Sequence, residues 1–157
     1  MKIIFWAIGK RHESFVKEGV KIFTDRISHY YPVEWKIFPP TKNASTLAND
    51  ELKKIESAAI LNAVKKDDVL IALEESGRQW NSTELASFIQ QKANESTKNL
   101  IFLIGGAYGL HENILNKCSC HWSLSKLVFP HQLVRLILAE QVYRACTIIR
   151  NEKYHHS

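Results

Sequence analysis

The sequence predicts an α/β fold in which a mostly parallel sheet is flanked by helices. Three short apolar runs, residues 3–8, 69–73 and 100–104, have the composition of strands buried on both faces, which is typical of parallel sheets, and the first strand is predicted over residues 2–8. Segments with helical spacing of apolar residues separate these runs. Strands and helices therefore alternate along the chain, and this alternation favours an α/β architecture.

The first half of the chain contains two predicted strands and two predicted helices. After the strand over residues 2–8, apolar residues recur at helical spacing over residues 12–30. Residues 33–38 alternate in hydrophobicity and predict a strand that stops at a Pro-Pro pair. Residues 41–49 have the composition of a loop, and a second helix is predicted over residues 50–65.

The second half begins with the strand over residues 69–73, followed by Glu75-Ser-Gly-Arg, which we interpret as a turn. Asn81 can cap the next helix, because Glu84 stands three residues later and completes a capping box. That helix is predicted to end near Asn94, before the strand over residues 100–104.

The chain is predicted to finish with two helices and a short strand. A short helix is expected near residues 112–116, and a strand over residues 122–124. Pro130 suits the first turn of a final helix that reaches about Arg150. This helix is apolar on more than one side, so we expect it to pack on its own sheet and on a second copy of the chain in a homodimer.

Length and composition indicate a single domain over residues 1–157. No apolar run approaches the roughly 20 residues that a membrane span needs, and the first apolar run is too short for a signal peptide. Three cysteines form no disulfide framework, so we expect a cytoplasmic protein without membrane contact. The net charge of +5 favours acidic partners, including nucleic acid, without requiring them.

Gly105 and Gly106 follow the most apolar strand directly and mark the expected mouth of a small-molecule site. Glycine allows a positive φ and a close approach of a ligand to the main chain, and ligands bind at the carboxyl ends of the strands in open α/β sheets. A plain turn without a ligand is the alternative. The Gly-Gly-x-x-Gly spacing matches neither a dinucleotide fingerprint nor a phosphate-binding P-loop.

Four further patterns allow a functional or a purely structural interpretation. The segment 123–132 could bind adenine through its main chain, or could be a plain loop. His131 and Arg135 share a helical face and could bind phosphate, although a surface pair is favoured on spacing alone. The tail 150–157 could bind RNA or fray. Glu74 and Glu75 could form an acid–base pair, but adjacent strand residues point to opposite faces, so we expect no shared site unless the turn has already begun there.

Cys118, Cys120 and His121, with His111 nearby, resemble a zinc site only weakly. The spacing is not Cys-x-x-Cys, and the chain has no second pair of cysteines. We therefore expect no metal, and we interpret the cysteines as small buried residues.

Taken together, several motifs resemble the RlmH (YbeA-like) family of SPOUT-class RNA methyltransferases over the whole chain. The matching segments occur in family order and are most specific in the second half. They are Leu73-Glu-x-x-Gly77, Ser82-x-Glu84-Leu-Ala86, Ile104-Gly-Gly-Ala-Tyr-Gly-Leu-His111, Leu124-Ser-Lys-Leu-Val-Phe-Pro-His-Gln132, Glu140-Gln-Val-Tyr-Arg-Ala145 and Arg150-x-x-x-Tyr-His155. The chain departs from its relatives at Ala107-Tyr108 and at the terminal His156-Ser157.

The resemblance implies a SPOUT-type fold with a C-terminal trefoil knot, and a homodimer that acts on the assembled ribosome. It implies methylation of N3 of a pseudouridine in helix 69 of 23S rRNA with S-adenosylmethionine. It also implies that Tyr154 and His155 face the target base across the dimer interface. Carried over by position, the cofactor site comprises Leu73, Gly105, Gly106, Leu124, Ser125, Lys126, Leu127, Val128 and Phe129.

Methylation at N3 requires removal of a proton, either by a base or with cations that stabilise the ring anion. His131, Arg135, Arg144 and His155 are the candidates, and the sequence does not choose among them. Two other functions stay open at this point. One is a non-catalytic RNA-binding ribosome-assembly factor on the same fold, and the other is a nucleotide-dependent enzyme that acts on a small molecule.

Overall fold

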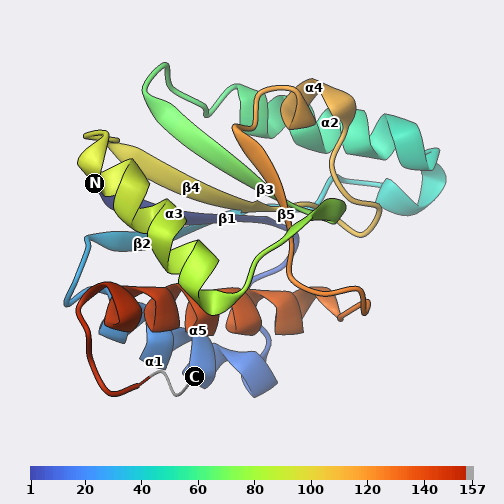
Figure 1. Cartoon of the computed structure of the whole chain (residues 1–157). Coiled ribbons are helices and arrows are strands. Elements are labelled where there is room, and N and C mark those ends of the chain that lie inside the picture. The colour runs from blue at the N-terminus through green and yellow to red at the C-terminus, as the bar shows by residue number, and fades with distance from the viewer. Residues whose placement is uncertain (155–157) are drawn as a thin grey trace.

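In the computed structural model, which describes residues 1–154, a five-stranded sheet lies between two layers of helices (Figure 1). The strand order is β2-β1-β4-β3-β5, and every neighbouring pair is parallel. The prediction of an α/β fold with a parallel sheet flanked by helices is therefore confirmed. The strands are β1 (Lys2–Ile8), β2 (Val33–Phe38), β3 (Asp68–Gln79), β4 (Asn99–Ile104) and β5 (Cys120–Ser123).

The helices divide between the two faces of the sheet. α1 (Ser14–Ile27), α3 (Ser82–Asn94) and α5 (His131–Ile149) cover one face, whereas α2 (Asn49–Leu61) and the short α4 (Glu112–Leu115) cover the other (Figure 1). A short 3₁₀ turn, Ala44–Thr46, precedes α2. None of the helices within residues 1–154 has the length and apolar character needed to cross a membrane.

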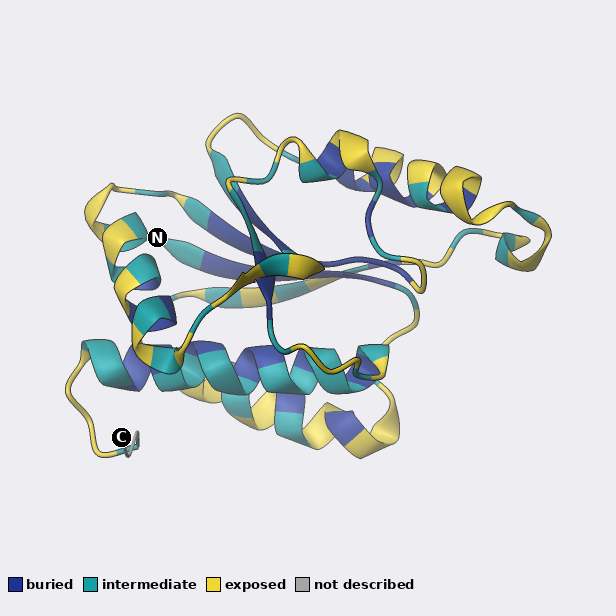
Figure 2. Cartoon of the chain, turned by 45° about the vertical axis from the view of Figure 1, so that its right-hand side comes forward, coloured by how far each residue is buried: buried dark blue, intermediate teal, exposed yellow. Residues whose placement is uncertain are grey.

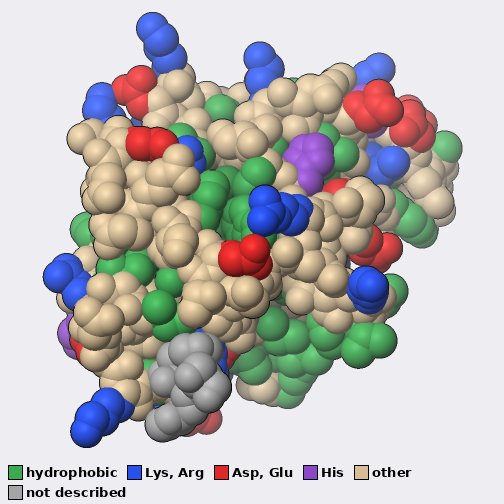
Figure 3. All heavy atoms as spheres, viewed as in Figure 1, with side chains coloured by type: hydrophobic (Ala, Val, Ile, Leu, Met, Phe, Trp, Pro, Cys, Tyr) green, Lys and Arg blue, Asp and Glu red, His purple; other side chains and the backbone are tan. Residues whose placement is uncertain are grey.

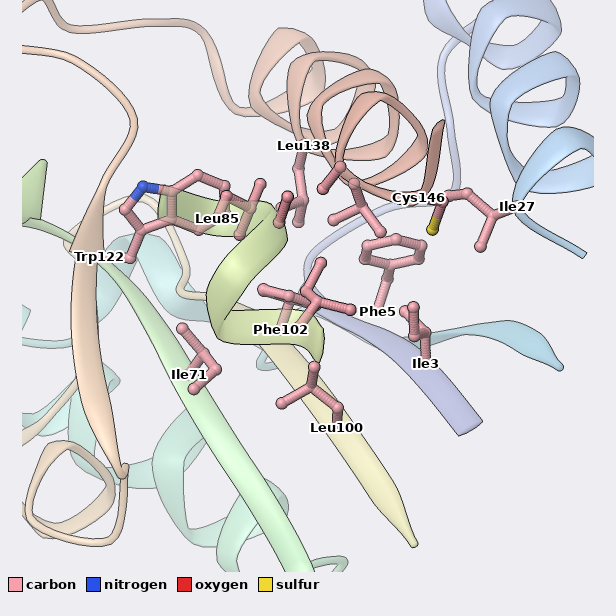
Figure 4. Packing of buried hydrophobic residues seen from close by; sticks show 14 of the residues in the cluster. Ile3, Phe5, Ile27, Ile71, Leu85, Leu100, Phe102, Trp122, Leu138 and Cys146 are labelled. Atoms are coloured by element: carbon pink, nitrogen blue, oxygen red, sulfur yellow. The ribbon is translucent and has the colours of Figure 1, made fainter. Parts of the chain in front are cut away.

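Each face of the sheet builds its own hydrophobic core, because successive side chains of the central strands point to opposite faces. On the α1, α3 and α5 side, Phe5 stacks on Trp35 and on Phe102, with ring centroids 4.6 and 5.9 Å apart (Figure 4). On the α2 and α4 side, Trp6 and Leu103 pack in a second core. Complete burial of one large apolar side chain contributes roughly 1.5–3 kcal/mol to folding. The two cores together therefore stabilise the sheet whose carboxyl edge carries the site.

Sequence reasoning overestimated the lengths of α1 and α2. α1 begins at Ser14 and ends at Ile27, and α2 ends at Leu61. Beyond each end, the main chain tightens into turns with i→i−3 hydrogen bonds, as in Tyr30 N–H to the Ile27 carbonyl at 2.9 Å. Periodicity extends through such turns, which explains the overestimate. The capping box of Asn81 and Glu84 at the start of α3 is confirmed.

The predicted turn at Glu75-Ser-Gly-Arg is wrong, because β3 continues through these residues to Gln79. The pairing of β3 with β5 becomes irregular between Leu73 and Arg78, so the strand bends without ending. Gly77 permits the bend, since a Cβ atom there would lie 2.7 Å from the main chain of His121 and Trp122. The turn-like composition therefore reflects a close contact between two strands.

α5 lies against two helices of its own chain, α1 and α3, as well as against the sheet. No residue of α5 is exposed, and Figure 2 shows the helix in blue and teal, whereas α2 carries exposed yellow stretches. The structure thus accounts for the apolar character of α5 within one chain. A second copy is not needed to cover this helix, so a dimer requires a different argument.

Candidate functional site

A cavity of about 830 Å³ lies at the carboxyl ends of β4 and β5, beside the point where β3 bends after Leu73. Two loops form its main walls: residues 105–110, here called the glycine loop, and residues 124–129, here called the C-terminal loop. Its volume lies in the range of small-molecule sites. The structure brings the predicted cofactor residues together here, with the exception of Lys126; those lining the cavity are Leu73, Gly105, Gly106, Leu124, Ser125, Leu127, Val128 and Phe129.

The glycine loop is glycine-rich for a different reason from the predicted one. The expected positive φ is absent at Gly105 and Gly106, and occurs instead at Gly109, with φ +83°. A Cβ atom on Gly105 would lie 2.8 Å from the main chain of Gly109, and one on Gly106 would lie 2.3 Å from Glu56 Oε2. Close packing of the protein on itself therefore requires both glycines.

The C-terminal loop presents main-chain groups and apolar side chains to the cavity. Ser125 shapes it, because its hydroxyl accepts the Leu127 N–H at 3.0 Å and its carbonyl accepts the Ser123 hydroxyl at 2.9 Å. The side chains of Leu127 and Val128 are 71% and 78% exposed. Figure 3 shows hydrophobic side chains gathered at the lower right, over the start of α5 and the loop before it. This part of the cavity mouth is an apolar surface.

His131, the first residue of α5, joins the helix to the glycine loop. Its Nε2 lies 3.1 Å from the Gly106 carbonyl oxygen, and since a carbonyl only accepts, Nε2 carries the proton. Burial lowers the pKa of His131; the hydrogen bond to the Gly106 carbonyl offsets part of this shift, and the nearby Arg135 adds to it. The imidazole is therefore neutral at neutral pH, with Nδ1 unprotonated.

Arg135 does not belong to a surface pair with His131; that favoured interpretation is wrong. Its side chain is 1% exposed and does not line the cavity. The guanidinium donates to the Lys10 carbonyl at 2.8 Å and to the Ile8 carbonyl at 3.4 Å. The two residues share a helical face as predicted, yet His131 contacts the loop after β4 and Arg135 the loop after β1.

Arg144 and Tyr154 meet near the other end of α5, where Glu140 binds both. Glu140 Oε1 accepts from Arg144 Nε at 3.0 Å and from the Tyr154 hydroxyl at 3.1 Å. The Arg144 guanidinium lies over the Tyr154 ring, 4.8 Å from its centroid. Tyr154 is thus held in place, whereas His155 lies outside the described residues. Along the helix axis, Arg144 is about 20 Å from His131 at the cavity.

Sequence reasoning missed the contribution of α2 to the cavity. Asp50 and Lys53 line it, joined by an ion pair at 3.8 Å. No local sequence pattern identifies these residues as part of the site. They lie some 50 residues before the glycine loop, and only the tertiary packing of α2 brings them to the cavity. Glu74 and Glu75 both line the cavity, against the expectation that they would not share a site, because β3 bends just after Leu73.

The cysteines lie outside the cavity. Burial raises the pKa of Cys118 to about 12 and that of Cys120 to about 11, so both are thiols at neutral pH. Cys118 donates to the Ile114 carbonyl at 3.3 Å, and His121 Nε2 lies 3.1 Å from the Leu115 carbonyl. Within residues 1–154, no group of three or more His, Cys, Asp or Glu side chains is arranged to hold a metal ion.

Comparison with known proteins identifies the family to which the chain belongs. A family model described as "Predicted SPOUT methyltransferase" matches residues 1–155. A protein of Cytophaga hutchinsonii is 46% identical over 99% of this chain and 100% of its own length. Proteins of Christiangramia forsetii and Bacteroides thetaiotaomicron are 40% and 34% identical, each over 99% of both chains. All three carry the name "Ribosomal RNA large subunit methyltransferase H".

The parallel sheet with a cavity at its carboxyl edge is thus that of a methyltransferase, and the prediction that the chain is an enzyme is confirmed. The chain belongs to the SPOUT methyltransferase family, and its resemblance to the RlmH group within that family is confirmed by the full-length relatives.

Proposed function

We propose that this protein transfers a methyl group from S-adenosylmethionine to N3 of a pseudouridine in helix 69 of 23S rRNA, in the cytoplasm and on the assembled ribosome. The observation that carries the proposal is the cavity formed by the glycine loop and the C-terminal loop in a member of this family. The relatives named for large-subunit rRNA support the choice of substrate. The finer target, helix 69, follows from the resemblance of the motifs between residues 73 and 155.

The residues of the cavity fit S-adenosylmethionine. The C-terminal loop offers main-chain amides and carbonyls for an adenine ring, next to the apolar side chains of Leu73 and Leu124. The carboxylates of Glu74 and Glu75 at the wall suit a ligand that carries positive charge. Trp122 lines the same cavity, and its buried Nε1 has no hydrogen-bond partner within residues 1–154. When bound, S-adenosylmethionine supplies an electrophilic methyl group on a sulfonium.

The chain itself must orient the base and manage its N3 proton. Alignment of the reacting atoms supplies much of the rate in such a displacement. His131 is neutral and stands at the cavity, so it can accept a proton through Nδ1. Arg144, which Glu140 holds, is the cation that can stabilise the ring anion, and Tyr154, packed against Arg144, supplies an aromatic ring for contact with the base. Arg135 lies away from the cavity and donates a hydrogen bond to the main chain of the loop that follows β1.

A complete site requires two copies of the chain. Arg144 is about 20 Å from the cavity along α5, too far for both to contact one nucleotide within one chain. The exposed Leu127 and Val128, with Phe15 at 65% exposure, supply an apolar surface for association. We place the Arg144 and Tyr154 end of one protomer at the cavity of its partner. A monomer at micromolar concentration in sedimentation velocity would contradict this arrangement.

Two structural expectations accompany this function. A single domain over residues 1–157 carries both cavity and tail, and the C-terminal segment forms the trefoil knot that SPOUT proteins have. The knot is inferred from membership of the family alone.

Methyl transfer from labelled S-adenosylmethionine to ribosomes from a strain that lacks the gene tests the proposal. Label in 23S rRNA at the helix 69 pseudouridine is expected, whereas ribosomes that already carry the methyl group serve as the control. A chain that binds rRNA but not the cofactor would instead be a non-catalytic assembly factor. A variant that lacks residues 154–157 should bind cofactor as the parent does and transfer no methyl group.

A further inference from the structure

The loop between β1 and α1, residues 9–13, carries two exposed cations at the carboxyl edge of the sheet. Lys10 and Arg11 are exposed, and neither forms an ion pair with another side chain in residues 1–154. β1 and β4 are adjacent and parallel, so the loop leaves the sheet beside the glycine loop. We call residues 9–13 the basic loop.

Two side chains of α5 fix the main chain of the basic loop. Gln132 donates to the Arg11 carbonyl and accepts from the Glu13 N–H, each at 3.2 Å. Arg135 donates to the Lys10 carbonyl at 2.8 Å, and its Nη1 lies 3.5 Å from His12 Nδ1. The backbone is therefore held, while the side chains of Lys10 and Arg11 stay free for a partner.

Arg135 also places a buried positive charge beneath this loop. Its side chain is almost completely buried, Nε has no hydrogen-bond partner, and no carboxylate in residues 1–154 forms an ion pair with it. Its acceptors are neutral carbonyls, so it adds positive potential without adding an exposed side chain, and the Glu13 carboxylate of the same loop offsets part of that potential. The N-terminus of α1 follows directly, without a side-chain cap, and its dipole adds to that potential.

The same turn of α5 joins the basic loop to the cofactor cavity. His131 contacts the Gly106 carbonyl in the cavity wall, and the next residue, Gln132, contacts the basic loop. His131 and Gln132 are consecutive residues, so the two loops are anchored to the same turn of α5. An anion bound at the basic loop is therefore fixed relative to the cavity.

We propose that Lys10 and Arg11 bind backbone phosphates of the rRNA next to the target nucleotide, and that Gln132 and Arg135 act as positioning residues for this contact. The inference rests on the proposed function for the identity of the RNA. Phosphate is the favoured partner because two free cations over a buried third match a polyanion, and the full-length relatives are named for methylation of ribosomal RNA. The contact is independent of the tail at Tyr154.

The test compares two double variants in binding and methylation of unmodified ribosomes. K10A/R11A removes the two cations of the basic loop. K65A/K66A removes two exposed cations from the segment that precedes β3, at the opposite edge of the sheet, and serves as the matched control. Binding is measured against salt concentration, and thermal unfolding midpoints check that both variants fold.

For K10A/R11A, we expect binding about 10-fold weaker at 0.1 M salt, a salt slope lower by about 1.5, and a raised KM with kcat unchanged. K65A/K66A should match the parent chain. A parental salt slope and KM in K10A/R11A, or an equal loss in the control, would overturn the proposal. If the parent binds ribosomes but transfers no methyl group, the proposed function fails, while the binding comparison still decides the role of the basic loop.

Discussion

Gly106→Ala should destabilise the protein through a single neighbour, the carboxyl group of Glu56. The added Cβ would lie 2.3 Å from Glu56 Oε2 and 3.1 Å from its Cδ. The backbone at Gly106 does not have a positive φ, so alanine is sterically allowed there and the clash alone accounts for the effect. Glu56 is 9% exposed, which leaves its carboxyl group little room to move away.

The magnitude follows from overpacking in a buried region. Such substitutions reduce stability by about 1–3 kcal/mol, and we expect about 2 kcal/mol for Gly106→Ala. In a Glu56→Ala background the clashing atoms are absent, so the same substitution should reduce stability by less than about 1 kcal/mol. The two positions should therefore show a coupling energy of about 1 kcal/mol or more.

Urea unfolding of the parent, the two single variants and the double variant measures this coupling. Gly109→Ala is the control: its φ of +83° strains an alanine, but no atom lies within 4 Å of the added Cβ. Its penalty of roughly 1–2 kcal/mol should be the same with and without Glu56. A Gly106→Ala penalty that is equally large in both backgrounds would refute the steric explanation.

Three further outcomes are expected. Burial raises the pKa of Glu56, so its stabilising contribution is present below pH 4.5 and is lost as the pH rises through the raised pKa. The free energy of unfolding of Glu56→Gln should therefore increase relative to that of the parent between pH 4 and 7, and a constant difference would contradict this. Glu140→Gln weakens the hydrogen bonds that hold Arg144 and Tyr154, so rRNA methylation should fall in a labelled-methyl assay. Calorimetry should find the same affinity for S-adenosylhomocysteine as in the parent, and parental methylation activity would exclude this positioning role. Asn81→Ala removes the capping box and should lower the free energy of unfolding by about 1 kcal/mol, and an unchanged urea midpoint would count against the cap.

Local signals predicted most of the sheet. β1 and β2 have the predicted bounds, because apolar runs and a Pro-Pro pair mark their ends. The extension of β3 was not predictable, since Gly77 is explained only by the main chain of β5, more than 40 residues later. The apolar sides of α5 were recognised, but their partners, α1 and α3, are set by the fold.

The candidate site divides in the same way. The glycine loop and the C-terminal loop carry their own sequence signatures, and the structure brings them to one cavity. Asp50, Lys53 and Glu56 of α2 have no such signature, because only the packing of α2 on the sheet brings them near the glycine loop. For Arg135, the spacing predicted a shared face with His131 but not burial beneath the basic loop.

A crystal structure of the protein grown with S-adenosylhomocysteine would test most directly whether the cavity is the cofactor site. We expect one ligand per chain between residues 105–110 and 124–129, with its adenine ring against the main chain of the second segment. Ligand bound elsewhere, or both loops closed on each other by their own side chains at saturating ligand, would contradict this assignment.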